Sequence, residues 1–186
     1  ATVKLKENGT LVDYIVVHKG KPSSIYDASC DGVWLLRKEI FETRAWHSSN
    51  VNDWANSTLK SYLDSTFFAR FDKDIQAQIK QVKIPYRPGS GTSTTINSGA
   101  SGLSCKIFLL SATEVGYTKA NVNSYIPNGE GAKLDYFQNG NGTSEKIAKL
   151  NGSATYWWLR SPYAYSATRA WYVYSNGNAG DYGCTY

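Results

Sequence analysis

The chain has 186 residues, of which 41% are hydrophobic and 19% are charged. This composition is too apolar for a disordered chain, and the length suffices to bury a core, so we expect one domain over residues 1–186. No apolar run approaches the roughly 20 residues that a membrane span needs, and the N-terminus lacks a secretory signal pattern. We therefore expect no membrane insertion.

The formal net charge is +5, from 20 Lys and Arg against 15 Asp and Glu. Nucleic-acid-binding proteins gather basic side chains into a stripe, whereas here they are scattered, so we expect no nucleic-acid partner. The three cysteines are Cys30, Cys105 and Cys184. Their spacing excludes a CxxC zinc or redox motif and leaves both one disulfide and three thiols open.

Two strands and two helices are predicted in the first half of the chain. Alternation of side-chain types predicts a strand over 11–17, and a short apolar run predicts another over 33–36. Apolar residues at helical spacing predict helices near 57–66 and 72–82. Pro85 should end the second helix, because residues before proline avoid the helical conformation.

The middle of the chain alternates between loops and short apolar runs. Gly, Ser and Thr predominate over 87–104 and predict a long loop. Residues 107–110 are a candidate buried strand, and Ser111 to Glu114 has the pattern of a capping box that opens a short helix. A second loop is expected over 121–143 and a helical turn over 145–150.

These elements predict an α+β fold in which the two helices pack on a small twisted antiparallel sheet, with long loops between. The apolar stripes of the helices must be covered, and the apolar runs are their available partners.

Aromatic residues concentrate at the C-terminus, where seven of the 14 tyrosines lie within residues 156–186. Strand alternation places Trp171 and Val173 on one face and Tyr172 and Tyr174 on the other. We assign the more apolar pair to the core, so the two tyrosines should point outward. Tyrosine mixed with Ser, Gly and Asn is typical of adaptable binding surfaces.

This composition predicts a single ligand-binding patch, for which the alternative is a contact with a neighbouring subunit. The patch would comprise Tyr163, Tyr165, Ser166, Arg169, Tyr172, Tyr174, Asn176, Asn178, Asp181 and Tyr182.

Three further residues of the same region are expected to be structural. Arg160 lies between Leu159 and a Ser-Pro pair, so we expect it to be buried and to join loops through several hydrogen bonds. Trp158 and Trp171 are expected to belong to the core.

The segment Tyr156 to Pro162 contains the motif WLRSP. Through this motif the chain resembles an uncharacterised protein family that is common in Gram-positive gut bacteria and their phages. The runs 34–36, 56–59 and 108–111 agree with that family. The resemblance implies a C-type-lectin-like fold, shared with formylglycine-generating enzymes and with the variable proteins of diversity-generating retroelements. It also implies a closing C-terminal strand, which this sequence lacks after Tyr186.

The resemblance implies a protein of the phage virion, in the tail or fibre, facing the extracellular side. Its tyrosine patch would recognise a host cell-surface protein or glycan. The composition also fits retroelement-type variation, which yields Asn, Tyr, Ser, Asp and Thr. The alternative is a structural or decoration protein whose tyrosines contact other virion subunits. In either case a homo-oligomer is expected.

An enzyme of the formylglycine-generating type is disfavoured, because that chemistry needs a closely spaced cysteine pair for copper, and Cys184 stands far from Cys105. A calcium-dependent lectin needs a carboxylate-rich loop, which the segment 126–130 matches only in part. His18 and His47 accompany no nucleophile-elbow motif. We therefore expect no catalytic activity, metal or cofactor.

Overall fold

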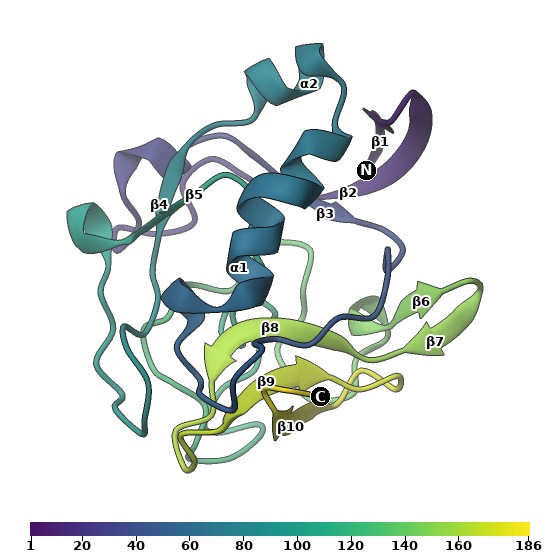
Figure 1. Cartoon of the computed structure of the whole chain (residues 1–186). Helices are drawn as coiled ribbons and strands as arrows, with labels where there is room; N and C mark the ends of the chain where they lie inside the picture. The colour runs from purple at the N-terminus through teal and green to yellow at the C-terminus, as the bar shows by residue number, and fades with distance from the viewer.

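The computed structural model describes all 186 residues as an α+β domain, which confirms the predicted class (Figure 1). The helices are α1 (Thr58–Tyr62) and α2 (Lys73–Gln78). The strands are β1 (Thr2–Glu7), β2 (Thr10–Lys19), β3 (Val33–Arg37), β4 (Val82–Ile84), β5 (Leu103–Cys105), β6 (Ala148–Leu150), β7 (Ser153–Thr155), β8 (Trp157–Pro162), β9 (Arg169–Val173) and β10 (Ala179–Gly183).

The strands form four small antiparallel sheets rather than the one sheet that we predicted. The first has the order β1-β2-β3, and the two strands predicted over 11–17 and 33–36 form its β2 and β3. Asn8 and Gly9 join β1 to β2, both with positive φ (49° and 79°). An Asn-Gly pair favours this tight hairpin turn, because both residues tolerate the left-handed region.

The first predicted helix is confirmed and runs longer than expected. The Ser57 side chain caps α1 by accepting a hydrogen bond from the Lys60 amide at 3.1 Å. Beyond Tyr62 the chain continues through a π-helical turn (Leu63–Phe67) and a 3₁₀ turn (Phe68–Arg70). Leu59 on α1 and Leu63 and Phe67 on the π-helical turn are buried, so this helical segment contributes an apolar stripe to the core.

The second predicted helix is wrong in its last turn, because α2 ends at Gln78 and buries none of its residues. Residues Val82–Ile84 instead form β4, which pairs with β5 and buries Ile84 completely. The gain from pairing and burial in the sheet outweighs the weak local preference for helix.

Three other expectations in the middle of the chain also need correction. Residues 107–110 are outside the sheets, and the strand lies earlier, in β5. The Ser111–Glu114 capping box forms, with reciprocal hydrogen bonds of 2.9 and 3.1 Å, but only turns follow it. The segment 145–150 contributes only to a 3₁₀ turn before entering β6. Each of these segments is stabilised by distant contacts that local patterns do not contain.

The C-terminal sheet has the order β10-β9-β8 and separates two hydrophobic clusters. Trp171 and Val173 of β9 point into the first cluster, whereas Ala170 of the same strand belongs to the second, together with α1. Figure 1 shows α1 on one side of this sheet, with β6 and β7 at its edge. None of the helices is long and apolar enough to cross a bilayer.

Candidate binding surface

Six aromatic side chains gather on one face of the C-terminal sheet, which we call the tyrosine face. Tyr172 lies at its centre, with ring centroids of Tyr174, Tyr156 and Trp158 at 4.6, 5.6 and 5.8 Å. The tyrosine face comprises Tyr156, Trp158, Tyr172, Tyr174, Tyr182 and Tyr186. Trp158, Tyr172 and Tyr182 lie on neighbouring strands, and Tyr156 and Tyr174 lie just outside them, two residues from Trp158 and Tyr172. This alternate spacing places the rings on one face.

Glycine at position 180 makes room for the two central rings. Gly180 of β10 is the cross-strand partner of Tyr172. A Cβ atom there would lie 2.9 Å from Cζ of Tyr172 and would also overlap the Tyr174 ring. The absence of a side chain therefore lets both rings lie over β10.

Tyr172 is buried, which contradicts our expectation that it points into solvent. Only 5% of it is exposed, whereas Tyr174 and Tyr182 are 42% and 39% exposed. Strand alternation does send Trp171 and Val173 into the core, as predicted. Tyr172 points to the opposite face, but the other aromatic rings of that face cover it, and sequence alternation carries no information about such covering.

A second aromatic group lies on the other face. The rings of Tyr163 and Tyr165 lie 5.4 and 4.9 Å from that of Tyr125, and Tyr163 also packs on Trp171 at 5.1 Å. Because Trp171 and Tyr172 point to opposite faces of β9, the two groups do not merge. The prediction of one continuous patch is therefore wrong, since the tyrosines divide between two faces of the sheet.

The polar residues of the predicted patch make local contacts. Arg169 pairs with Asp181 across β9 and β10, and its guanidinium lies 5.6 Å from the Tyr182 ring centroid. The Asn176 side chain accepts a hydrogen bond from the Asn178 amide in the β9–β10 turn. The Ser166 carbonyl accepts a hydrogen bond from Asn52, and this bond anchors the β8–β9 connection.

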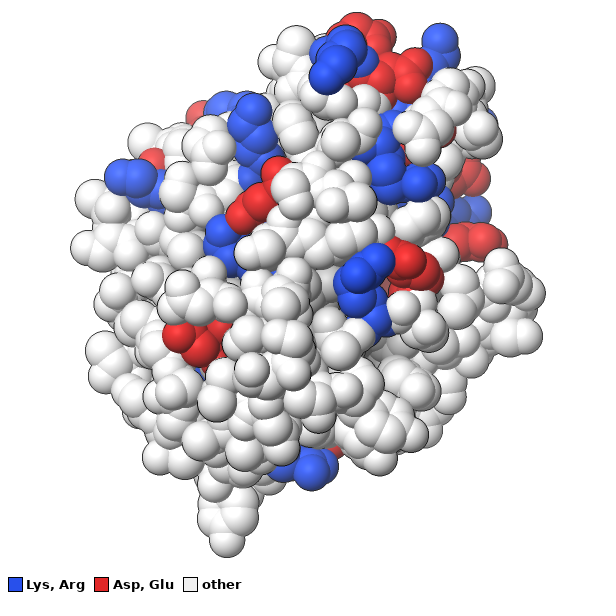
Figure 2. Space-filling view, in the orientation of Figure 1, with Lys and Arg blue, Asp and Glu red and all other residues white.

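Charged side chains are sparse over the C-terminal sheet. Figure 2 shows them gathered in the upper part of the molecule, over the helices and the N-terminal strands, with few below. Depletion of charge together with enrichment of Tyr and Trp is the composition of interface cores. The tyrosine face therefore has the properties of a contact surface.

Arg160 is fully buried, as predicted, and joins β8 to two distant segments. It makes a bidentate ion pair with Glu114 at 2.6 and 2.7 Å. Its remaining hydrogen bonds go to the carbonyls of Pro85 and Leu109, at 3.1 and 2.9 Å. The Tyr26 hydroxyl also donates to Glu114 at 2.7 Å, so the carboxylate is well satisfied.

The two tryptophans that we assigned to structure also bridge segments. The indole of Trp158 donates to the Arg44 carbonyl at 3.0 Å, and that of Trp171 donates to the Tyr125 carbonyl at 3.3 Å. Trp171 is buried in the first cluster, whereas Trp158 is half-buried beside the second.

Glu130 is buried near this network, but its carboxyl oxygens have no hydrogen-bond partner. Burial raises the pKa of this carboxyl to about 7, against the opposing effect of the Arg160 charge. The Ser161 side chain also lowers the pKa of the Glu130 carboxyl, although the two groups do not form a well-aligned hydrogen bond. No group of three or more His, Cys, Asp or Glu side chains is arranged to hold a metal ion.

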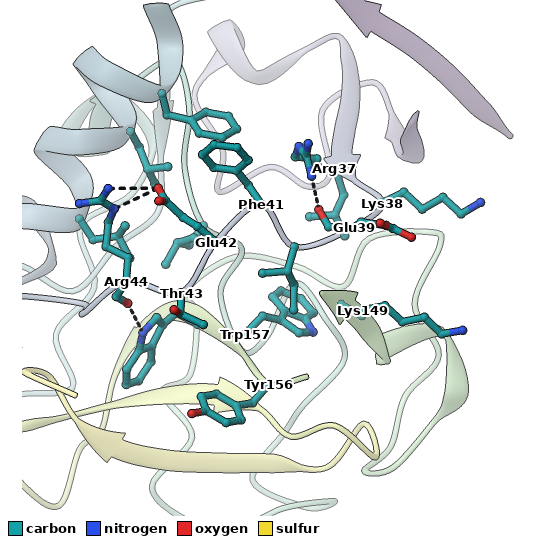
Figure 3. Close-up of a pocket in the computed structure, with 18 of the residues that line it drawn as sticks. Arg37, Lys38, Glu39, Phe41, Glu42, Thr43, Arg44, Lys149, Tyr156 and Trp157 are labelled. Atoms are coloured by element: carbon teal, nitrogen blue, oxygen red, sulfur yellow. Dashed lines mark hydrogen bonds and ion pairs between the residues drawn. The ribbon is translucent and has the colours of Figure 1, made fainter. Parts of the chain in front are cut away.

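An apolar groove with a volume of about 870 Å³ opens beside the tyrosine face. It separates the helical segment from β6 and β8, and the connecting segment 38–45 runs along it (Figure 3). The lining residues are Ile15, Leu36, Arg37, Lys38, Glu39, Ile40, Phe41, Glu42, Thr43, Arg44, Ala45, Leu59, Tyr62, Leu63, Phe67, Leu109, Tyr136, Glu145, Lys146, Ile147, Ala148, Lys149, Tyr156, Trp157, Trp158 and Tyr186.

Hydrogen bonds attach the connecting segment 38–45 to β6 and to β8. The Ile40 amide donates to the Lys149 carbonyl at 2.8 Å, and the Arg44 carbonyl accepts from Trp158. The groove is open to solvent, so water fills it when no ligand is bound.

Three of the aromatic residues that line the groove also belong to the tyrosine face, namely Tyr156, Trp158 and Tyr186. The two features are therefore adjacent. Tyr156 and Tyr186 were not in the predicted patch, and the groove was not predicted from the sequence. The aromatic enrichment of residues 156–186 was a signal for the two tyrosines, whereas no local pattern brings the 38–45 segment beside β8.

The molecule is thus a small α+β domain with an exposed aromatic face and an adjoining apolar groove. Residues 31–186 match the family described as a domain of unknown function, DUF6273. Because the match covers most of the chain, the protein belongs to that family. No curated protein and no solved structure matches the chain.

Proposed function

We propose that this protein is a ligand-binding domain of a phage virion, in the tail or fibre, and that its tyrosine face recognises a host cell-surface protein or glycan. The observation that carries the binding role is the tyrosine face itself: four of its rings are 39–66% exposed in a region of low charge. Rigid aromatic side chains give large contact area at low entropic cost. The virion setting rests on the WLRSP resemblance.

The same proposal includes a C-type-lectin-like version of the α+β fold. Support comes from the order of elements, with a helical segment early in the chain, long connections over residues 85–147 and a closing antiparallel sheet. An experimental structure that superimposes poorly on C-type-lectin-like domains would contradict this part of the proposal and leave the binding role in place.

The binding role is tested by substituting exposed rings of the tyrosine face. Tyr174→Ala combined with Tyr182→Ala should weaken attachment to host cells or isolated envelope by about 2 kcal/mol, roughly thirtyfold, because exposed tyrosines are frequent binding hot spots. Binding is measured with the purified domain by surface plasmon resonance or a cell pull-down. Tyr172 is left intact, since its burial would confuse binding with folding.

Tyr165→Ala is the matched control, because this exposed tyrosine belongs to the group on the opposite face. The proposal predicts a loss for the double variant and little change for the control. Equal losses for both, or unchanged binding of the double variant with native circular dichroism, would contradict a role of the tyrosine face.

A second candidate function is a structural or decoration role in the virion, in which the tyrosine face contacts a neighbouring subunit. The low charge of the face favours this role equally, because subunit interfaces have the same composition. Under this alternative the double variant impairs homo-oligomer or particle assembly, and assembled particles still attach to the host. Under the first function particles assemble normally and fail to attach.

A further inference from the structure

We infer that the groove beside β8 binds an amphipathic anion, an aliphatic chain that carries a terminal carboxylate. The chain would occupy the space between the helical segment and β6–β8, and the carboxylate would lie at the end marked by Lys38 and Lys149 (Figure 3). This site is separate from the exposed rings tested above, so it stands or falls independently of the partner of the tyrosine face.

The apolar part of the inference rests on the lining of the groove. Of its 26 lining residues, 17 are hydrophobic, and they come from both sides. Leu63 and Phe67 of the π-helical turn line one side, and Ile147 and Trp157 line the other. π-Helical turns frequently accompany functional sites, and apolar pockets of this size are typical of small-ligand sites.

The charges inside the groove argue for one polar end only. Glu42 pairs with Arg44 at 3.1 Å, and Glu145 pairs with Lys146 at 3.0 Å. Arg37 pairs at 3.0 Å with Glu7, which is not a lining residue. These pairs offer few free polar partners to a buried ligand. A glycan would bury many hydroxyls without partners, which is costly, whereas an aliphatic chain would bury none.

The remaining charges determine the sign of that polar end. Five basic and three acidic side chains line the groove, and because Arg37 is neutralised by Glu7 outside the lining, a net charge of +1 remains. Lys149 forms no ion pair, and Lys38 forms a long one, at 3.9 Å, with Asp13, whose carboxylate also pairs with Lys4 at 2.5 Å. The acidic lining residue Glu39, which forms no ion pair, lies beside Lys38 and Lys149 (Figure 3). The groove therefore complements a negative group at this end.

Dodecanoate is a suitable probe, and dodecyltrimethylammonium has the same chain length with a positive head. We expect the intact protein to bind dodecanoate below its micellar concentration, measured by isothermal titration calorimetry, and to prefer it over the cation at least about fivefold. The Trp157 and Trp158 fluorescence should change on binding, because both indoles line the groove.

Two variants test the two parts of the site. Lys149→Glu should weaken dodecanoate binding about tenfold through charge reversal. It should also reduce the preference of the protein for dodecanoate over dodecyltrimethylammonium. Ile147→Glu should weaken the binding of both ligands, because it places a charge in the apolar lining. Ile147 is 38% exposed, so the fold should tolerate the change. Lys119→Glu is the control, since Lys119 is exposed and outside the groove.

Binding of dodecanoate with this variant pattern supports the inference. It is overturned by a lack of dodecanoate binding, by equal affinity for the cation, or by variants at Lys149 and Ile147 that bind like the Lys119 control. A maltooligosaccharide that binds with higher affinity and displaces dodecanoate would likewise overturn it in favour of a glycan site.

Discussion

Arg160 shows how one side chain connects segments that are far apart in the sequence. Its guanidinium contacts Glu114 and the carbonyls of Pro85 and Leu109, all within 3.1 Å. A buried pair of this kind adds little net stability when intact, because both charges lose their hydration. Removing one partner is different, since the other charge then stays buried and unpaired.

Arg160→Ala should therefore lower the free energy of unfolding by roughly 2–4 kcal/mol, measured by urea denaturation. Arg169→Ala is the comparison, because Arg169 is 40% exposed and its pair with Asp181 is partly hydrated, so the loss there should stay below about 1 kcal/mol. An unchanged denaturation midpoint for Arg160→Ala would show that the buried pair is dispensable.

At the scale of elements, β9 and β10 depend on each other through side-chain packing as well as through their hydrogen bonds. Tyr172 of β9 and Tyr174, which directly follows the strand, lie on one face of the sheet, and their rings extend over Gly180 of β10. The two rings can therefore hold these positions only because residue 180 is glycine. This arrangement keeps Tyr172 covered while Tyr174 remains half-exposed.

Gly180→Ala should displace the Tyr174 ring, because the new methyl group would overlap it, and should destabilise the domain by roughly 1–3 kcal/mol through overpacking. Thermal denaturation and near-ultraviolet circular dichroism measure the two effects. Gly183→Ala on the same strand is the control, since its nearest contact would be an ordinary 3.6 Å from Asn50. Equal melting temperatures for both variants would argue against the packing that we describe.

At the scale of the whole molecule, buried carboxyls make stability depend on pH in opposite directions. The pKa of Glu130 is raised to about 7, so the folded state holds its proton more tightly than the unfolded chain, whose pKa is near 4.5. Partial burial tends to raise the pKa of Glu145, but hydrogen bonds from Thr143 and Gln138 and the contact with Lys146 lower it to about 2. The two groups therefore act in different pH ranges.

Glu130→Gln should stabilise the protein relative to the native chain as pH rises from about 4.5 to 7, by at most roughly 3 kcal/mol, and should leave stability below pH 4.5 nearly unchanged. Glu145→Gln should have the opposite pattern, with a loss of stability above pH 4.5 that vanishes as pH falls toward 2. Urea denaturation over this pH range measures both. If the stability of Glu130→Gln depends on pH in the same way as that of the native chain, the Glu130 carboxyl is not buried without a partner.

Local sequence patterns were sufficient for those features that depend on near neighbours. The alternation over 11–17 predicted a strand, and that over 171–174 also predicted that Trp171 and Val173 point inward, because the side-chain period of a strand is two. Ser57 and Leu59 to Leu63 determined the start and the buried stripe of the first helix, and the flanks of Arg160 indicated its burial. The α+β class and the aromatic concentration at the C-terminus followed from the sequence alone.

Tertiary structure decided the features that depend on distant partners. Residues 82–84 became a strand because β5 was available to pair with them, and Tyr172 became buried because rings from β8 and β10 cover it. The groove exists only because the 38–45 segment is attached to β6 and β8, more than 100 residues further along the chain. Contacts of this kind depend on three-dimensional packing, which no periodicity within a single segment encodes.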